Sequence, residues 1–451
     1  MPYVQNTNED REEMLAAIGV SSIDSLFECI PESVRFKGDL PLQPALSEPE
    51  MMAHIQAICE RNQSLDELVC FLGAGIYDHY IPPVVDFISG RSEFYTSYTP
   101  YQAEASQGNL QVFYEYQTLI CNLTGMDVAN ASLYDGASAL AESVLMAQNI
   151  ARKDGIMLSG GVHPEYAQTL KTHIRHLDVP LHEISINETG STDLDALQAA
   201  LKKEEHPGVV VVQQPNFFGI IEDLSAAATI AHESQALLVV CINPIAMGIL
   251  KPPGDCEADI VCGEGQCLGI PPSFGGPCLG ILATRDEYVR KIPGRLVGQT
   301  RHEKGDRAFV LTLQTREQHI RRERATSNIC TNHALLALRA TVYLSALGKH
   351  GLAQVATLCT QKSHALGDSL TELGHPPLYS GAFFNEFVID CGRSANSVLD
   401  GMLAKGYLAG LALGRFHSTR ENHLLLCVTE QRTKEQIEDF ANKLGEVIRE
   451  T

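Results

Sequence analysis

Uninterrupted apolar runs that alternate with amphipathic segments constrain the fold of this chain more than any other feature of its sequence. A strand that is apolar at every position is buried on both faces of a sheet, whereas a half-exposed strand alternates apolar and polar residues. The sequence therefore predicts an α/β fold, in which helices cover a mainly parallel sheet. The predicted strands are 155–160, 181–186, 208–215 and 236–243, and the predicted helices are 106–125, 139–153, 164–176, 193–205 and 223–234.

The rhythm of the sequence changes after about residue 330. A long helix-like segment over 326–352 is followed by predicted strands at 386–390 and 424–429 and by a closing amphipathic helix. This pattern is typical of a smaller α+β domain. The first sixty residues hold apolar residues at helical spacing and no strand pattern. We therefore expect three parts, a helical N-terminal arm (1–60), a large α/β domain (61–330) and a small α+β domain (331–451).

The balance of charge argues against two classes of partner. Fifty-five acidic and 34 basic residues give a formal net charge of −21, which repels phosphate backbones and anionic lipid. We expect neither nucleic acid nor a membrane as a partner. The first fourteen residues carry four carboxylates and no apolar stretch, and the longest apolar stretch, 236–250, is broken by Asn243 and Pro244. These features predict no leader peptide, no membrane span and a cytoplasmic protein.

The thirteen cysteines are an odd number without a C-x-x-C pair, which favours free thiols in a reducing compartment over a disulfide framework. The densest group has spacings of 6, 5 and 11 residues, which match no zinc pattern. We therefore expect no metal site. That group is Cys256, Cys262, Cys267 and Cys278.

The order of a large α/β domain, a long helix and a small C-terminal domain resembles the aspartate-aminotransferase-like enzymes of fold type I, which use pyridoxal phosphate (PLP). That cofactor needs a lysine for the aldimine, a carboxylate that faces the pyridine nitrogen, a stacking ring and a small-residue turn for the phosphate. Gly136, Ala137 and Ser138 offer backbone N–H groups in such a turn. An ordinary helix cap by Asp135 or Ser138 explains the same residues at least as well.

The other requirements for PLP are not met where this layout would place them. The strand that should supply the carboxylate, 237–243, contains neither Asp nor Glu. The glycine-rich loop that should carry the lysine has Gln266, whose amide cannot form a Schiff base. Lys251 and Lys291 lie outside that loop and are expected at the surface. The residues thus predict a PLP-enzyme fold that does not bind PLP covalently.

Two segments, 71–83 and 92–108, concentrate Gly, Pro, Tyr, Gln and His, and their polar groups are too many for a core. Their tyrosines and Gln102 could donate hydrogen bonds to a carboxylate or a phosphate, and Glu104 is expected to open the next helix. A tyrosine-rich interface explains them equally well. The candidate residues are Tyr77, His79, Tyr95, Tyr98, Thr99, Tyr101, Gln102 and Glu104.

Basic side chains cluster in the segment 315–328 of this acidic protein. They could neutralise an anionic ligand or a partner, and ion pairs with Glu317 and Glu323 are the alternative. The cluster comprises Arg316, Arg321, Arg322 and Arg324.

Several of these motifs together resemble one family closely. The strings FLGAGIYDHYIPP, YTSYTPYQAEASQGNLQ, YDGASALAE, SFGGPCLG and TLQTREQHIRRERATSNICTN are similar to the glycine decarboxylase P-protein of the glycine cleavage system. The resemblance runs from about residue 5 to the C-terminus. It is specifically to the separate N-terminal, or alpha, subunit found where that protein is made as two chains.

The resemblance implies an enzyme, glycine dehydrogenase, that removes CO2 from glycine as a PLP adduct and transfers the aminomethyl group to the lipoyl arm of the H-protein. It implies that the beta subunit carries the PLP lysine, and that alpha and beta form an α2β2 assembly. Segments 73–82 and 95–107 would then lie at the mouth of the beta active site. One departure is Ala103, where the family usually has Pro, and it removes no polar group.

Two alternatives remain open from the residues alone. The chain could be a self-sufficient PLP enzyme that uses a lysine outside the expected loop. It could also be a non-catalytic module that docks the lipoyl carrier or regulates the beta subunit.

Overall fold

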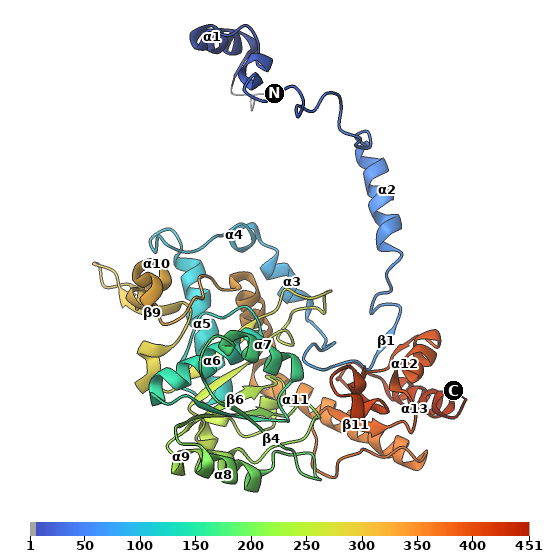
Figure 1. Cartoon of the computed structure of the whole chain (residues 1–451). Helices are drawn as coiled ribbons and strands as arrows, with labels where there is room; N and C mark the ends of the chain where they lie inside the picture. Colours follow the sequence, from blue (N-terminus) through green and yellow to red (C-terminus); the bar gives the residue numbers. More distant parts are fainter. Residues whose placement is uncertain (1–5, 451) are drawn as a thin grey trace. The chain divides into compact units, whose positions relative to one another are not determined.

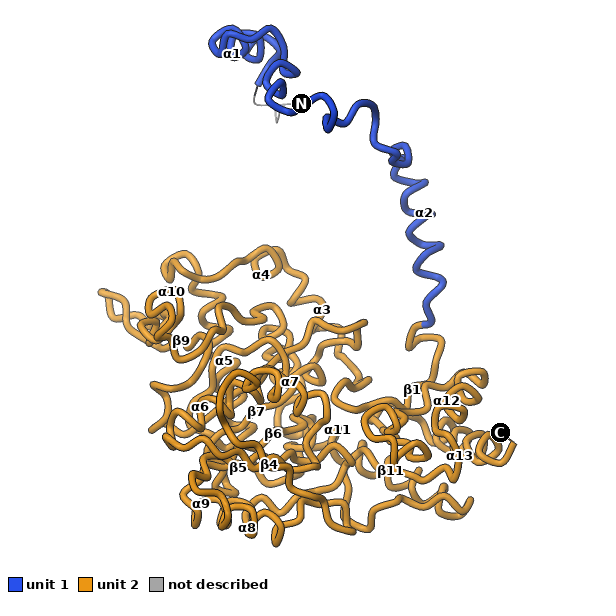
Figure 2. The backbone as a smooth tube through the Cα atoms, viewed as in Figure 1, with its two compact units in different colours: residues 1–63 blue, residues 64–451 orange. Residues whose placement is uncertain are grey.

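The computed structural model describes residues 6–450, and the chain divides into two compact units, residues 1–63 and residues 64–451 (Figure 2). The smaller unit is helical, as expected of the N-terminal stretch. Each of its two α-helices begins with a capping box, formed by Thr7 with Asp10 and by Ser47 with Glu50, which satisfies backbone N–H groups of the first turn. These helices are α1 (Asn8–Ile18) and α2 (Glu48–Cys59), with a 3-10 turn over Asp24–Phe27 between them.

A seven-stranded sheet forms the centre of the larger unit (Figure 1). Its strand order is β2-β8-β7-β6-β5-β3-β4, and the pairs from β7 to β4 are all parallel. The prediction of a mainly parallel sheet is therefore confirmed, and β2 and β8 add an antiparallel edge. The strands are β2 (Val128–Ala129), β3 (Gly155–Ser159), β4 (Leu181–Ile184), β5 (Pro207–Gln214), β6 (Leu237–Ile242), β7 (Ile260–Glu264) and β8 (Gly280–Thr284).

Helices cover both faces of this sheet, as the continuous apolar strands predict. Because successive side chains of a strand point to opposite faces, Val209 and Val211 pack with α6 and α7, while Val210 and Val212 pack with α5, α8 and α9. Both sets of valines are buried. The helices are α5 (Gln107–Thr124), α6 (Gly136–Ala151), α7 (Pro164–Ile174), α8 (Leu194–Lys203) and α9 (Leu224–Glu233).

A second apolar core lies in the C-terminal part, around a three-stranded antiparallel sheet of order β11-β14-β13. The α+β prediction for this part is confirmed, and the boundary expected at about residue 330 stays a prediction. The ring of Phe71 stacks on that of Phe440, with centroids 3.8 Å apart, so the N-terminal end of the larger unit packs in this core. The elements are β11 (Glu386–Asp390), α12 (Ala395–Ala404), β13 (Leu411–Ala412), β14 (His423–Cys427) and α13 (Lys434–Glu450), and β1 (Val69–Cys70) pairs with β12 (Tyr407–Leu408).

The long helix α11 (Ala334–Glu372) leads from the α/β part into the second core. It begins eight residues later than the predicted segment 326–352 and continues twenty residues further. Gly348 adopts φ of 59° and ψ of −177° within it, so the helix is interrupted there.

The remaining elements border the α/β part. A hairpin of β9 (Leu296–Arg301) and β10 (Arg307–Thr312) is held to α5 by Gln107, whose amide both donates to and accepts from the backbone of Phe309. None of the helices within residues 6–450 is long and apolar enough to cross a membrane. All thirteen cysteines are free thiols. The short helices here are α3 (Pro83–Ser89), α4 (Ser92–Tyr95) and α10 (Gln318–Arg321).

Candidate active-site cavity

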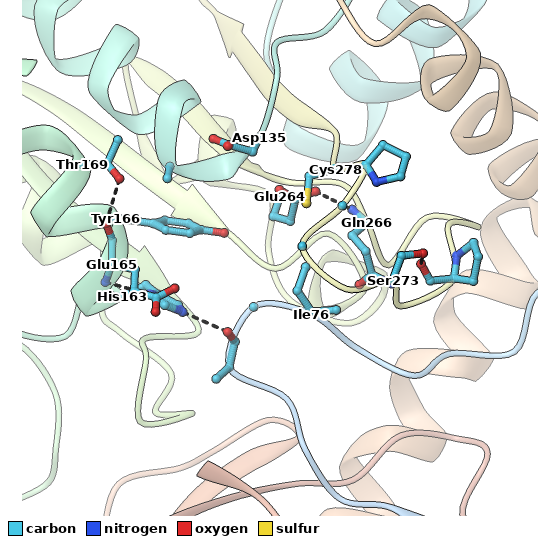
Figure 3. Close-up of a pocket in the computed structure, with 17 residues that line it drawn as sticks. Ile76, Asp135, His163, Glu165, Tyr166, Thr169, Glu264, Gln266, Ser273 and Cys278 are labelled. Carbon is cyan, nitrogen blue, oxygen red and sulfur yellow. Dashed lines mark hydrogen bonds between the residues drawn. The ribbon is translucent and has the colours of Figure 1, made fainter. Parts of the chain in front are cut away.

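A cavity of about 270 Å³ lies at the carboxyl end of β7, beside the first turns of α6 and α7 (Figure 3). The backbone of residues 74–76 forms one wall, and the loop that follows β7 forms another. Ligands of open α/β sheets bind at this end of the strands. The residues that line the cavity are Ala74, Gly75, Ile76, Asp135, Ala137, His163, Glu165, Tyr166, Thr169, Glu264, Gln266, Pro271, Ser273, Gly275, Gly276, Pro277 and Cys278.

Gln266 fills its position in this loop as a structural residue. Its side-chain oxygen accepts a hydrogen bond from the N–H of Tyr77 at 2.8 Å, and its amide nitrogen donates to the carbonyls of Tyr77 (3.1 Å) and Ile270 (2.7 Å). The residue is only 2% exposed. Every polar atom of the side chain is therefore used to hold the 74–77 segment against the loop after β7.

The turn at the start of α6 is satisfied by carboxylates of the chain itself. Asp135 caps the helix, and its side chain accepts from the N–H of Ser138 at 2.6 Å, so the helix-cap alternative is confirmed. The N–H of Gly136 donates to Glu264 at 2.9 Å. The other oxygen of Glu264 accepts from the N–H groups of Gln266 and Leu279. Burial raises the pKa of Glu264 to about 7, although these hydrogen bonds lower it.

Gly136 allows this close approach because a side chain would not fit there. A Cβ atom at Gly136 would lie 2.6 Å from the hydroxyl of Tyr166 and 2.9 Å from the Cβ of Glu264. The small-residue turn is thus required by contacts within this chain.

His163 and Glu386 also hold the 74–77 segment in place, through hydrogen bonds to Ala74 and Tyr77. His163 accepts from the N–H of Glu165 at Nδ1, so Nε2 carries the proton and donates to the carbonyl of Ala74 at 2.9 Å. Glu386 accepts from the N–H of Ala74 at 2.6 Å and from the hydroxyl of Tyr77 at 2.9 Å. Burial raises the pKa of Glu386 to about 7 and lowers that of His163.

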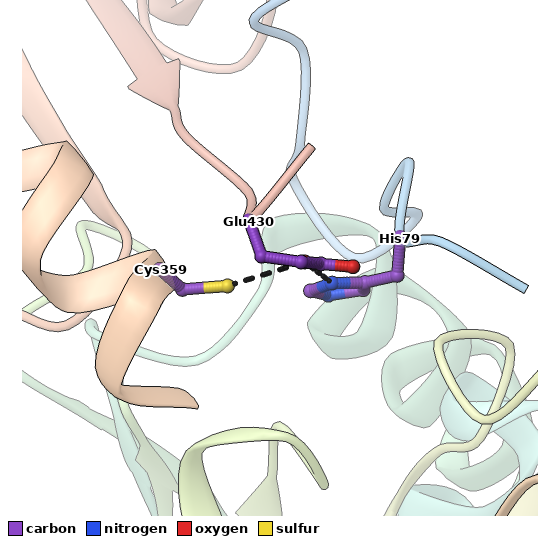
Figure 4. A group of neighbouring side chains, drawn as sticks. All are labelled: His79, Cys359 and Glu430. Carbon is purple, nitrogen blue, oxygen red and sulfur yellow. Dashed lines mark hydrogen bonds and ion pairs between the residues drawn. The ribbon is translucent and has the colours of Figure 1, made fainter. Parts of the chain in front are cut away.

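His79 is buried in a separate group with Glu430 and Cys359 (Figure 4). Its Nδ1 lies 2.6 Å from a Glu430 oxygen, and the Cys359 thiol donates to the same oxygen at 3.5 Å. Burial opposes ionisation of Glu430, but the contacts with His79 and the N–H of Tyr80 lower its pKa below the ordinary value. Burial raises the pKa of Cys359. These contacts hold residues 79–80 to the segment that follows β14, while Nε2 of His79 is buried without a hydrogen-bond partner.

The segment before α5 is exposed, in contrast to Tyr77 and His79. Tyr95, Tyr98 and Tyr101 are 68%, 88% and 66% exposed. Gln102 is also exposed, and Thr99 is half-buried. Glu104 does not open the helix as expected, because α5 begins at Gln107 after Ser106. Placement of these residues at a partner's active site stays a prediction.

The arginines of the basic cluster do not all lie together, because only Arg316 and Arg321 line the same cavity. Arg316 is buried and Arg321 is exposed, and they line one cavity together with Arg290. Arg322 does not line that cavity, and Arg324 lies 3.8 Å from Glu323 at the surface. Of the expected ion pairs, Arg324 forms one with Glu323, and within residues 6–450 neither Glu317 nor Glu323 lies within ion-pair distance of Arg316 or Arg321.

The residues of the cavity at Gln266 do not fit PLP. Three carboxylates line it, from Asp135, Glu165 and Glu264, and no lysine or arginine of residues 6–450 does. A carboxylate already occupies the N–H group of Gly136, where a phosphate would be received. Lys291 donates to Asn149 outside the cavity. The negative charge of the cavity at Gln266 therefore disfavours an anionic cofactor, and the residues that line it suggest no covalent chemistry.

Sequence reasoning identified Gln266 and the turn at Gly136, and it missed Glu264, Tyr166 and Glu386. Glu264 carried a weak signal, since it ends an apolar run just before a glycine-rich loop. Glu386 begins a predicted strand, and nothing near it in sequence points to the 74–77 segment.

Comparisons with known proteins give consistent results. The family model described as "Glycine cleavage system P-protein" matches residues 1–444. The chain is 52% identical over 444 residues to the "Probable glycine dehydrogenase (decarboxylating) subunit 1" of Geobacillus kaustophilus (98% of each chain), and 50% identical to the protein of that name from Shouchella clausii (99% of each). A crystal structure of glycine decarboxylase (P-protein) in inhibitor-bound form matches with a TM-score of 0.88 and 39% identity, covering 99% of this chain and 100% of the other.

More distant structures support the fold alone. A sphingosine-1-phosphate lyase of Burkholderia pseudomallei matches with a TM-score of 0.66 and 15% identity, over 93% of this chain and 94% of its own. A NifS-like protein of Rickettsia africae matches with a TM-score of 0.64 and 14% identity, over 85% and 99%. The expected PLP fold type I architecture is confirmed by these neighbours and by the topology of the sheet.

Proposed function

We propose, since this chain belongs to the P-protein family of the glycine cleavage system, that it is the alpha subunit of glycine dehydrogenase (decarboxylating) and acts only with a beta subunit that carries PLP. In this proposal the α2β2 assembly removes CO2 from glycine and transfers the aminomethyl group to the lipoyl group of the H-protein, in the cytoplasm. The PLP of the beta subunit supplies the electron sink for decarboxylation.

The hydrogen bonds of the cavity at Gln266 support the proposal that the beta subunit, and not this chain, carries PLP. Gln266 uses both polar atoms of its side chain in hydrogen bonds to Tyr77 and Ile270, and Glu264 accepts the N–H of Gly136. The cavity at Gln266 therefore offers neither an amine for a Schiff base nor an open turn for an anion. A protein of this family that decarboxylates glycine needs these groups from another chain.

The contribution of this chain is then to orient the substrate and to exclude water at the beta active site. The exposed tyrosines of residues 95–101 suit this work. Tyr is favoured at protein contacts, because its ring is apolar and its hydroxyl can still donate a hydrogen bond. The neighbouring Tyr80 is also exposed and has a rigid support. The N–H of Ala74 donates to Glu386, and the N–H of Tyr80 itself donates to Glu430.

Single substitutions in the exposed segment test the proposal. Tyr95→Ala, Tyr98→Ala and Gln102→Ala leave the fold intact, because these side chains are exposed. We expect at least one of them to lower the decarboxylation rate of the reconstituted assembly by about tenfold, which corresponds to about 1.4 kcal/mol of lost transition-state stabilisation. The measurement is glycine-dependent CO2 exchange, with assembly followed by size-exclusion chromatography.

Leu403→Ala serves as the matched control, because Leu403 is an exposed apolar residue on α12. It should change neither the rate nor the assembly. Full rates in all three variants would contradict the placement of residues 95–107 at the beta active site.

A further inference from the structure

A second cavity, of about 340 Å³, lies beside the β9-β10 hairpin and is lined mostly by arginines. Arg290 lies in a 3-10 turn over Asp286–Lys291, Arg316 ends another over Gln314–Arg316, and Arg321 ends α10. Leu313 and Thr315 complete the lining. Three guanidinium groups thus converge from segments that are about thirty residues apart in a chain whose net charge is −21.

Arg316 carries a buried charge with no carboxylate of residues 6–450 within ion-pair distance, and only the more distant Glu317 acts on it electrostatically. Its two terminal nitrogens donate to the carbonyls of Ile292 and Gly294, and its Nε is buried without a partner. The residue is 8% exposed. Buried charges in proteins are normally paired, because carbonyl groups alone compensate the loss of hydration only in part. An anion in the adjoining cavity would add negative charge to that of Glu317.

The two other arginines are also without acidic partners. No carboxylate of residues 6–450 lies within ion-pair distance of Arg290 or Arg321. Near Arg321 in the sequence, Glu323 pairs with Arg324 at 3.8 Å. One oxygen of Glu317 lies 3.6 Å from His319, and its other oxygen is buried without a hydrogen-bond partner. Arg290 and Arg321 are exposed and so can reach a ligand from solvent.

We propose that Arg290, Arg316 and Arg321 form a binding site for a phosphate-type oxyanion, separate from the cavity at Gln266. The planar guanidinium fork matches the oxygens of a phosphoryl group, and several arginines together are the usual means of recognising one. The cavity is larger than a phosphate ion, so a small phosphate monoester also fits. This site is independent of the decarboxylase proposal, because it uses no residue of segments 73–82 or 95–107.

Calorimetric titration of the full chain with inorganic phosphate, at constant ionic strength against chloride, tests the site. We expect Arg290→Ala and Arg321→Ala each to weaken phosphate binding by about tenfold, as expected for loss of one charge-assisted hydrogen bond. The double variant should abolish measurable binding. Both side chains are exposed, so the variants should unfold at the temperature of the parent chain. Arg316→Ala is left out, since the loss of a buried side chain could impair folding.

Arg324→Ala is the matched control, because Arg324 lies in the same basic segment, is exposed and does not line the cavity. It should bind phosphate like the parent chain. A parallel titration with glycerol phosphate distinguishes the source of the anion: tighter binding than phosphate supports a monoester ligand, and weaker binding supports the free ion. Binding that chloride reproduces, or that the double variant retains, would overturn the proposal.

Discussion

Replacing Gln266 by lysine should destabilise this chain by about 3 kcal/mol and should not give it the ability to bind PLP. The amide of Gln266 both accepts from and donates to the backbone of Tyr77, and an ammonium group can only donate. The N–H of Tyr77 would be left buried without an acceptor. The new amine would also meet a cavity lined by Asp135, Glu165 and Glu264, in which the turn at Gly136 is already satisfied.

Chemical denaturation measures the first part of this prediction, and borohydride reduction with PLP followed by intact mass measures the second. Gln361→Lys, at an exposed position of α11, is the matched control and should cost less than about 0.5 kcal/mol. A stable Gln266→Lys variant that acquires a reduced pyridoxyl adduct would show that the cavity accepts PLP and needs only the amine.

Glu386→Gln should remove about 2.5 kcal/mol of the pH dependence of stability between pH 5 and pH 8.5. Burial raises the folded-state pKa of Glu386 from 4.5 to about 7. A carboxyl group with a raised folded pKa contributes stability that is fully present below its unfolded pKa and is lost as the pH rises through its folded pKa. The parent chain should therefore lose stability over this range, and the variant, which cannot titrate there, should lose less.

Urea denaturation at several pH values measures the difference. Glu438→Gln removes one carboxylate from the exposed face of α13, so it controls for the change in net charge. It should follow the parent chain. Equal slopes for Glu386→Gln and the parent would mean that Glu386 is not held in a buried, weakly hydrated position against Ala74 and Tyr77.

Four of the five parallel strands of the large sheet, β3 to β6, could be predicted within one or two residues of their bounds. A run such as Val209–Val212 is buried on both faces, and its composition alone excludes an exposed strand. The start of α11 could not be predicted in the same way. Residues 326–333 are mostly Thr, Ser, Asn and Cys, which favour a helix only weakly, and long-range contacts hold them out of it. Asn332 donates to the carbonyl of Ala131 and accepts from Arg295.

The candidate site shows the same limit. Gln266 was identifiable from one position, because an amide cannot replace an amine in Schiff-base chemistry. Tyr77 and His79 were expected outside the core because their segment is rich in polar groups. That expectation was wrong, because both side chains are buried. Glu386 accepts from the hydroxyl of Tyr77 and Glu430 contacts Nδ1 of His79, and both acids lie more than 300 residues away in the sequence. Sequence patterns do not reveal such distant partners.

Glycine-dependent CO2 exchange by this chain, by the beta subunit and by their mixture tests the central claim most directly. Each sample contains PLP and lipoylated H-protein and is then reduced with borohydride and analysed by mass. We predict exchange only in the mixture and a pyridoxyl adduct only on the beta subunit. Exchange or an adduct on this chain alone would contradict the claim and indicate a self-sufficient enzyme, and full exchange by the beta subunit alone would reduce this chain to a docking or regulatory module.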